Sequence, residues 1–352
     1  NHLALSIYRQ AEVARKHKDI PTATSHFLRI TDITPESDIA PTGLYDAIAL
    51  FMSNKLWNKA ISAMKKFQHL YPAHKLSHNI TKNLSRAYLN SDQNLKAARE
   101  FERLATSGSD KNLKKTALLQ AAELYEEKGN YPAAIRSYGK YVSNYKKPFS
   151  QYMESMYKLL KLNEITHASK KASYWRKSII NADSRTYKKN KTARTKFITS
   201  TAIISLAREK DRRYRALKLI RPLKRNLRRK KKEMQRAVQL YGKASVYKIS
   251  EVSTEATYAI ASIYNDFSKA LLKAELPRNL NKDEREQYMI LLEDMAFPFE
   301  EKAIEFYELN MEHTRNNNYN NWIKKSLANL KVLFPVRYNR KLKIDRYINV
   351  LH

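Results

Sequence analysis

The chain has 352 residues, enough for one extended array of repeats or for two to three compact units. Only five residues are glycine, on which strand-rich folds and nucleotide-binding α/β folds depend for tight turns and close backbone approaches. The absence of cysteine excludes disulfides, Cys-ligated zinc and thiol catalysis within these residues. The composition therefore favours an all-α fold.

The formal net charge is +33, which attracts polyanions such as nucleic acid, anionic lipid headgroups or acidic protein surfaces without selecting among them. The most apolar window, residues 197–207, is about half as long as a bilayer-spanning helix, so we expect no membrane span. Because the first residue is Asn rather than Met, we expect this sequence to be part of a longer or processed polypeptide.

A repeat of 37 residues runs through the first part of the chain. A small residue, placed where the two helices of a hairpin cross, recurs at Ala23, Ala60, Ala97 and Ala134. Bulky residues follow four and seven positions later, which puts all three on one face of the second helix. These bulky residues are Phe27, Ile30, Met64, Phe67, Phe101, Leu104, Tyr138 and Tyr141. The third repeat is the weakest, since Leu95 and Ala98 also fit a register shifted by one.

Turn residues agree with this register. Pro35 and Pro72 stand just past the expected ends of second helices, where proline no longer interrupts a helix. Residues 129–131 form the expected bend of the fourth hairpin, and Trp57 and Tyr131 begin second helices. The pattern resembles tetratricopeptide repeats of slightly increased length. It predicts an all-α, right-handed superhelix of tandem tetratricopeptide-like helical hairpins with a C-terminal helical module.

We predict three segments. Four hairpins occupy residues 1–148, degenerate hairpins and the start of a basic block occupy 149–222, and long helices with a C-terminal capping module occupy 223–352. In the second segment we expect a fifth hairpin with Tyr174 and Trp175 as packing residues. A sixth hairpin is expected to pair 197–206 with 214–220, and one or two long helices should cover 232–274.

The C-terminal segment carries helix boundaries of its own. Asn281 and Glu284 have the spacing of a reciprocal N-terminal cap, which we expect to open a helix that runs through Glu293. Pro298 is expected in the first turn of the next helix. Residues 316–318 should form a turn, and the last strong helix should run from 322 to 333, before Pro335.

Hairpin arrays line their concave face with side chains of the first helix of each hairpin. In the predicted register these include the candidate partner-binding residues Tyr8, Tyr45, Lys82, Arg86, Glu123 and Glu126. A solvated surface is the alternative for each of them.

A basic block lies between Arg185 and Lys232, with 20 Lys or Arg and only two acidic residues. Its densest run supplies the candidate polyanion-binding or acidic-surface-binding residues Lys224, Arg225, Arg228, Arg229, Lys230, Lys231 and Lys232. Three interpretations stay open: a solvated helix face, a docking surface for an acidic partner or anionic envelope surface, and a nucleic-acid-binding surface. The third lacks zinc-finger spacing, a helix-turn-helix signature and aromatic residues between the charges.

Signatures of catalysis are missing from the sequence. It has no Gly-rich phosphate loop, no G-x-S-x-G elbow and no H-E-x-x-H motif. His69, His74 and His78 are the nearest approach to a cluster, but they straddle Pro72 at the end of a hairpin, and structural or exposed histidines are the simpler interpretation. We therefore predict a non-catalytic protein without a cofactor or a metal site.

Separated motifs in the last third of the chain resemble one bacterial family. The motifs lie at residues 255–264, 267–272, 275–277, 286–293, 297–305, 322–326 and 335–338. They are similar to the C-terminal region of large envelope tetratricopeptide proteins, which accompany TonB/ExbB/ExbD-type energy-transducing systems or the gliding-motility machinery. The resemblance covers about residues 250–338, although this chain is richer in Lys and Asn than the family.

The resemblance implies a periplasmic scaffold that couples inner-membrane motor proteins to outer-membrane or peptidoglycan partners. The implied partners are other proteins of an envelope complex, with an anionic envelope surface as a further candidate. A nucleic-acid-associated helical repeat protein, binding through residues 185–232, is the alternative function.

Overall fold

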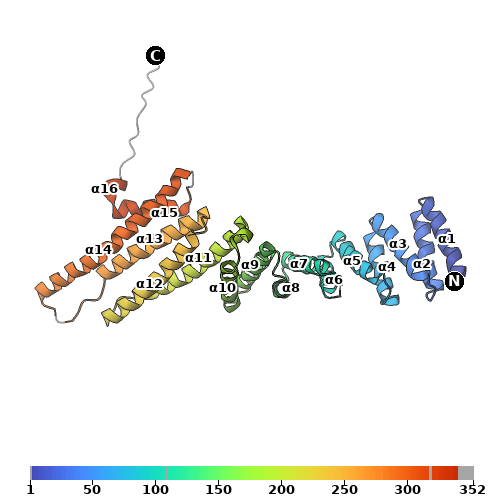
Figure 1. Ribbon diagram of the computed structural model, residues 1–352, viewed down its shortest axis with the longest axis horizontal. Helices are drawn as coiled ribbons and strands as arrows, with labels where there is room; N and C mark the ends of the chain where they lie inside the picture. Colours follow the sequence, from blue (N-terminus) through green and yellow to red (C-terminus); the bar gives the residue numbers. More distant parts are fainter. Residues whose placement is uncertain (1, 108–109, 279, 317–318, 340–352) are drawn as a thin grey trace, which may run out of the picture. The chain divides into compact units, whose positions relative to one another are not determined.

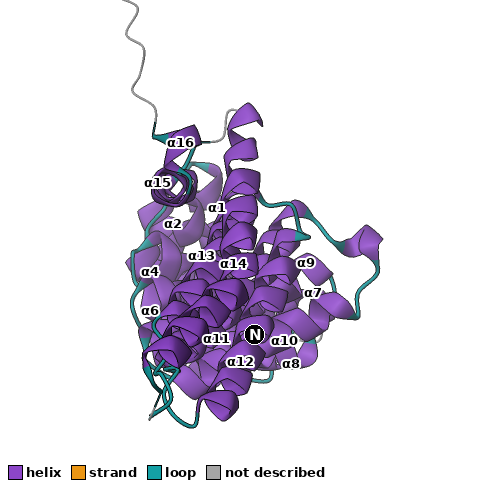
Figure 2. Ribbon diagram, turned by 90° about the vertical axis from the view of Figure 1, so that its left-hand side faces the viewer, coloured by secondary structure: helices purple, strands orange, loops and turns teal. Residues whose placement is uncertain are grey.

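The computed structural model describes residues 2–107, 110–278, 280–316 and 319–339, and within those ranges all regular structure is helical (Figure 2). The chain forms two compact units, residues 1–172 and 173–352, and the division falls inside the helix Ser169–Ser184 (α10). The predicted all-α class is confirmed. The three segments predicted from the sequence do not coincide with these units, and that division stays a prediction.

Unit 1 is a series of tandem hairpins in which each helix from α1 to α9 packs against the next (Figure 1). The helices are α1 (His2–Lys16), α2 (Ile20–Ile33), α3 (Ala40–Ser53), α4 (Trp57–Leu70), α5 (Ser77–Asn90), α6 (Asn94–Ser107), α7 (Lys111–Glu127), α8 (Tyr131–Asn144) and α9 (Phe149–Ile165).

The repeat residues form the core of unit 1. All four alanines at the predicted crossings are fully buried, as are the bulky residues that follow them. In the third repeat both Ala97 and Ala98 have 0% of their surface exposed, whereas Leu95 is 41% exposed. The unshifted register is therefore confirmed.

The predicted turns are found where the repeat places them. Pro35 and Pro72 each stand two residues beyond the end of a second helix. Gly129 has φ +71°, a left-handed conformation in which a side chain is disfavoured. Asn130 then caps α8, because its side chain accepts a hydrogen bond of 3.3 Å from the backbone N–H of Ala133.

Unit 2 contains long helices that pack in succession from α11 to α15. Its elements after α10 are η1 (Lys188–Asn190), α11 (Ala193–Ala216), α12 (Leu223–Ser245), α13 (Ser250–Leu272), α14 (Lys282–Glu312), η2 (His313–Asn316), α15 (Asn321–Leu333) and α16 (Pro335–Tyr338). No helix in the described ranges combines the length and the apolar character needed to cross a bilayer.

The predicted sixth hairpin is wrong, because residues 193–216 form one continuous helix. The charged segment that suggested a break is held in helical form by ion pairs one turn apart. Arg213 contacts Glu209 at 2.7 Å and Arg215 contacts Asp211 at 2.9 Å. Helix α11 packs instead against α12, which contains the densest run of the basic block.

The predicted helix boundary at Pro298 is also wrong, since α14 continues through it. Pro298 removes one helical hydrogen bond, a loss that typically costs about 3 kcal/mol together with its steric effects. Packing on α13 offsets this cost on both sides: Leu292 and Ala296 are buried before the proline, and Ala303 and Tyr307 after it.

The predicted cap at the start of α14 is confirmed, with reciprocal hydrogen bonds of 2.8 and 2.9 Å between Asn281 and Glu284.

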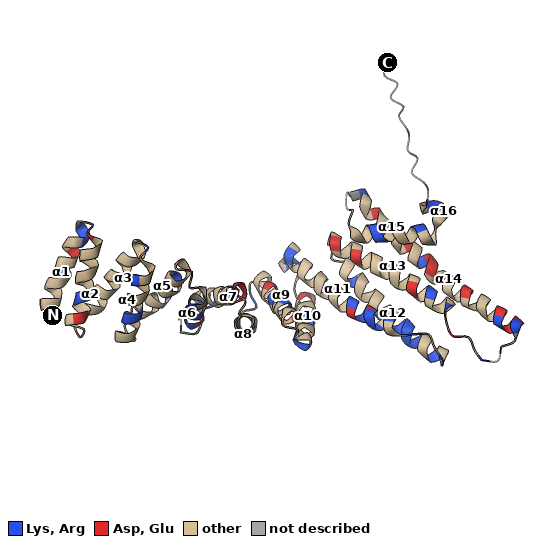
Figure 3. Ribbon diagram, turned by 180° about the vertical axis from the view of Figure 1, so that it is seen from behind, with Lys and Arg blue, Asp and Glu red and all other residues tan. Residues whose placement is uncertain are grey.

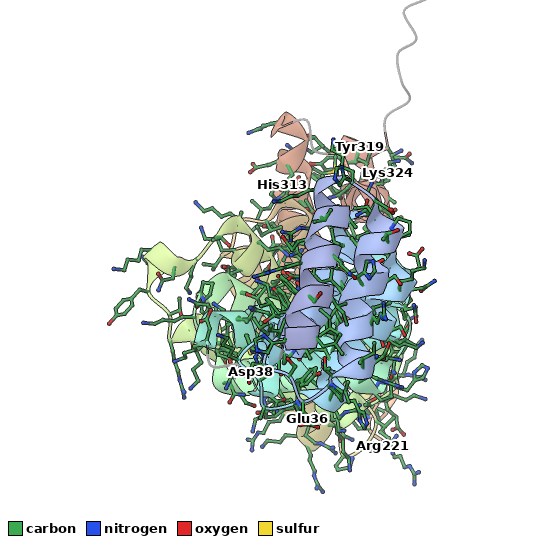
Figure 4. The ribbon with its side chains drawn as sticks, turned by 90° about the vertical axis from the view of Figure 1, so that its right-hand side faces the viewer. Glu36, Asp38, Arg221, His313, Tyr319 and Lys324 are labelled. Carbon is green, nitrogen blue, oxygen red and sulfur yellow. The ribbon has the colours of Figure 1, made fainter. Side chains whose placement is uncertain are left out.

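Helix α15 is fixed to α13 by the cap that begins it. Asn320 accepts hydrogen bonds from the N–H groups of Trp322 and Ile323, and its amide donates to Thr254 at 2.7 Å. Next to it, the ammonium group of Lys324 lies 5.3 Å from the centre of the Tyr319 ring (Figure 4). Of the predicted turn at 316–318, residues 317 and 318 lie outside the described residues.

One packing prediction fails in α10. The side chain of Tyr174 is 62% exposed, whereas Trp175 is half-buried. The two rings touch edge to face, with centroids 5.0 Å apart. Adjacent helical residues point about 100° apart, so both cannot face the same core.

Candidate functional site

The six candidate partner-binding residues all lie on first helices, as the register requires. They occur on α1 (Tyr8), α3 (Tyr45), α5 (Lys82, Arg86) and α7 (Glu123, Glu126). Lys82, Arg86 and Glu123 are exposed, while Tyr8, Tyr45 and Glu126 are half-buried. Their role in binding stays a prediction, and for two of them the structure also gives an internal role.

Tyr8 links two successive first helices. Its hydroxyl donates a hydrogen bond of 2.6 Å to Asp46 on α3, and its ring packs edge to face on Phe27 with centroids 5.2 Å apart. Burial, followed by the hydrogen bond to the Asp46 carboxylate, raises the pKa of Tyr8 well above its ordinary value. The phenol is therefore neutral and acts as a donor between hairpins.

Replacing Tyr8 by phenylalanine should lower the free energy of unfolding of unit 1 by about 1 kcal/mol, because one half-buried hydrogen bond is lost and the ring contact is kept. Urea denaturation followed by circular dichroism measures this change. A variant with unchanged stability but weaker partner binding would show instead that the hydroxyl acts in recognition.

Glu126 belongs to a charged cluster between α7 and α9. It accepts hydrogen bonds from the Tyr138 hydroxyl at 2.8 Å and from the Lys158 ammonium at 2.9 Å. Glu123 lies near the same lysine. Although the residue is exposed overall, partial burial of its carboxyl raises the pKa, while Lys158 opposes the shift and Glu126 adds to it. Within unit 1, the structure thus brings Glu123 and Glu126 together.

The densest basic run forms one face of α12. Six of the seven candidate residues are exposed there, and Figure 3 shows the row of Lys and Arg along this helix. We call this face the basic stripe: Lys224, Arg225, Arg228, Arg229, Lys231 and Lys232. At about 100° per residue, these six positions fall within an arc of roughly 160°, so they share one side of the helix.

No residue of the basic stripe forms an ion pair within the described ranges, in contrast to the arginines of α11. Arg208, for example, binds both carboxylate oxygens of the buried Glu255 at 2.6 Å. Glu209, Asp211 and Glu255 are thus engaged by arginines of α11, and Glu233 pairs with Arg236 of α12 itself. The charge of the basic stripe is therefore left uncompensated.

Lys230 is the seventh candidate, and it points the other way. Only 5% of its surface is exposed. Its ammonium donates hydrogen bonds to the carbonyl oxygens of Leu217 at 2.7 Å and Tyr214 at 3.2 Å, and it lies 4.2 Å from the centre of the Tyr214 ring. Lys230 therefore binds the carbonyl end of α11 rather than solvent.

Of the three histidines considered above, His74 has local partners. The ring of His74 lies 5.9 Å from that of Phe67, and its Nδ1 accepts a hydrogen bond from the N–H of Leu76. Across the described ranges, no group of three or more His, Asp or Glu side chains is arranged to hold a metal ion.

Comparison with known proteins agrees with the hairpin architecture. Residues 116–147, which span most of α7 and α8, match the tetratricopeptide repeat family. No curated protein sequence matches the chain.

Solved structures that match this chain share little sequence with it. A tetratricopeptide repeat protein from Parabacteroides merdae is 10% identical with a TM-score of 0.33, over 83% of this chain and 99% of that one. The tetratricopeptide domain of P58(IPK) is 13% identical with a TM-score of 0.27, over 96% and 99% of the two chains. The type IV pilus biogenesis factor PilW is 12% identical with a TM-score of 0.27, over 58% and 87%.

Proposed function

We propose that the chain is a non-catalytic protein–protein interaction scaffold whose basic stripe docks an acidic protein surface. The uncompensated charge of the stripe is the observation that carries this proposal. Six cations on one helix face repel one another, and they have no acidic partner among the described residues. An acidic partner relieves that repulsion and is guided to the site by its field.

The first-helix face of unit 1 is proposed as the second binding surface, for an extended or helical segment of a partner. Lys82 and Arg86 support this proposal, because both side chains are exposed one turn apart on α5. Arrays of hairpins offer such a face repeatedly, so that several weak contacts along one segment add up.

We propose further that the scaffold acts in the periplasm, in an energy-transducing or motility complex of the bacterial envelope. The resemblance over residues 250–338 supports this assignment. Most of the matching residues fall on α13, α14 and α15, where they form core contacts such as those of Tyr258 with Tyr307 and Trp322. They support family membership but do not form a site.

An affinity pulldown from crosslinked cells, followed by mass spectrometry, tests the function. Recovery of TonB-, ExbB- or motility-type envelope proteins supports the proposal. Recovery of RNA- or DNA-bound proteins that disappears after nuclease treatment would replace it by the alternative, a nucleic-acid-associated repeat protein that binds through residues 185–232.

Neutralising the basic stripe should remove the recovered partner from the pulldown. With all six residues replaced by glutamine, we expect the affinity to fall at least about tenfold, because exposed ion pairs each contribute a few tenths of a kcal/mol or more and 1.4 kcal/mol corresponds to a factor of ten. The loss should be smaller at high salt, where the charges are already screened.

A matched control removes the same charge from unit 1. It replaces six exposed lysines by glutamine: Lys16, Lys59, Lys65, Lys75, Lys111 and Lys140. An equal loss of affinity in this control would show that net charge alone attracts the partner and that the stripe is only a solvated face.

A further inference from the structure

Unit 2 contains a cavity that is separate from the basic stripe. It lies between the end of α10, the segment around η1, the first half of α11 and the end of α12, and its volume is about 630 Å³. Cavities that bind small organic molecules typically have volumes of roughly 300–1,000 Å³. Apolar side chains form part of its wall: Ile180, Ile203 and Val246.

Five lysines line the same cavity. They come from three separate segments of the chain: Lys188 and Lys191 near η1, Lys196 on α11, and Lys243 and Lys248 at and beyond the end of α12. The positive charge of Lys191 is offset by an ion pair, because its ammonium lies 2.6 Å from the carboxylate of Asp183. The other four have no acidic partner in the described part of the chain.

Asp183 fixes one side of this cavity. It is 1% exposed, and besides Lys191 it accepts a hydrogen bond of 2.7 Å from the hydroxyl of Tyr247. Through these two bonds, Asp183 near the end of α10 connects Lys191, just after η1, to Tyr247, just beyond α12. Because Lys191 offsets the charge of Asp183, the four remaining lysines leave the cavity strongly positive.

We propose that this cavity binds a small organic phosphate, with its phosphate groups on the unpaired lysines and its apolar part against Ile180, Ile203 and Val246. Lysine is a common ligand of phosphate, to which it offers a compact charge with three donors. Four lysines without an acidic partner, in the lining of a partly apolar cavity, match a ligand that has both a multiply charged end and an apolar end.

Isothermal titration calorimetry of the whole chain at physiological salt tests this site with three probes: ATP without divalent metal, inorganic pyrophosphate and adenosine. We expect saturable binding of ATP, weaker binding of pyrophosphate and none of adenosine. A soluble short-chain phosphatidic acid is titrated in parallel, and tighter binding of this lipid than of ATP would assign the phosphate to a lipid headgroup.

Two double variants locate the binding. Lys196→Gln with Lys243→Gln removes two charges from the cavity, and Lys224→Gln with Lys231→Gln removes two from the basic stripe. All four side chains are exposed, so both variants should fold. We expect the first to weaken ATP binding at least about tenfold and the second less than about twofold, where tenfold corresponds to 1.4 kcal/mol.

Three results would overturn the proposal. Absence of saturable binding at millimolar ligand concentrations would show that the cavity holds no phosphate. Equal affinity for ATP and pyrophosphate would exclude an organic phosphate held by the apolar wall. An equal loss in both double variants would show that the phosphate is attracted by net charge rather than by this cavity.

Discussion

Replacing Phe67 by alanine should lower the free energy of unfolding of unit 1 by about 3–5 kcal/mol, the usual cost of removing a buried aromatic side chain. Phe67 is the second bulky residue of the second repeat and is fully buried on α4. Its ring contacts those of Tyr71 and His74 edge to face, at centroid distances of 5.5 and 5.9 Å. The substitution leaves a cavity at the point where one hairpin meets the next, and helix packing around it can relax only in part.

Urea denaturation measures this loss, and amide hydrogen exchange shows where it occurs. Leu70→Ala is the matched control, because Leu70 lies on the same helix but is 38% exposed, and it should cost about 1 kcal/mol or less. Similar losses in the two variants would mean that the repeat residues do not form the continuous core described above. Faster exchange should be concentrated in the helices of unit 1.

The repeat could be predicted because its residues have to satisfy a spacing rule. Where two helices cross closely only a small side chain fits, and the bulky residues four and seven positions later must face the same neighbour. Even the weak third repeat was resolved correctly, since Phe101 and Leu104 are both buried in the unshifted register. Local turn residues such as Gly129 then fixed the boundaries of the hairpins.

Unit 2 was harder to predict because its helices are set by contacts distant in sequence. The continuous helix α11 depends on the ion pair of Arg208 with Glu255, 47 positions away, as well as on pairs within the helix. The continuous helix α14 depends on packing against α13 on both sides of Pro298. Local propensity pointed to a break in each case, and tertiary packing decided otherwise.

The candidate sites were also hard to predict where they depend on contacts between residues distant in sequence. Counting charges identified the basic stripe but could not show which residues have acidic partners, since some of those partners, such as Glu255, lie on other helices. Three of the cavity lysines lie within the basic block, but their grouping with Lys243 and Lys248 could not be predicted, because only the fold brings these three segments together. Lys230, in contrast, could have been recognised from the sequence. It stands seven and three residues after Leu223 and Leu227, and four and seven before Met234 and Ala237, which is the spacing of a buried helix face.

Because Lys230 is buried, unlike the six residues of the basic stripe, its replacement should have a second large effect on stability. Lys230→Ala should lower the free energy of unfolding by about 2–3 kcal/mol, because hydrogen bonds from a charged donor to two carbonyl groups are lost together with the packing of the side chain. Lys231→Ala removes the same residue type from the neighbouring exposed position and should change stability by less than about 0.5 kcal/mol. Chemical denaturation of the two variants measures the contrast, and equal effects would contradict the buried placement of Lys230.

The pH dependence of stability separates the charge of Lys230 from its packing. Burial, and then repulsion from Arg215, lowers the pKa of Lys230 below its ordinary value, while Asp211 opposes the shift. Between its folded and unfolded pKa values the unfolded chain binds the proton more tightly, so the stability contributed by Lys230 rises with pH in that window and is smallest below it. Lys230→Met keeps most of the apolar contacts but cannot titrate. The stability of the wild-type chain relative to this variant should therefore increase as the pH rises toward the ordinary lysine pKa, and a constant difference would show that folding does not lower the pKa of Lys230.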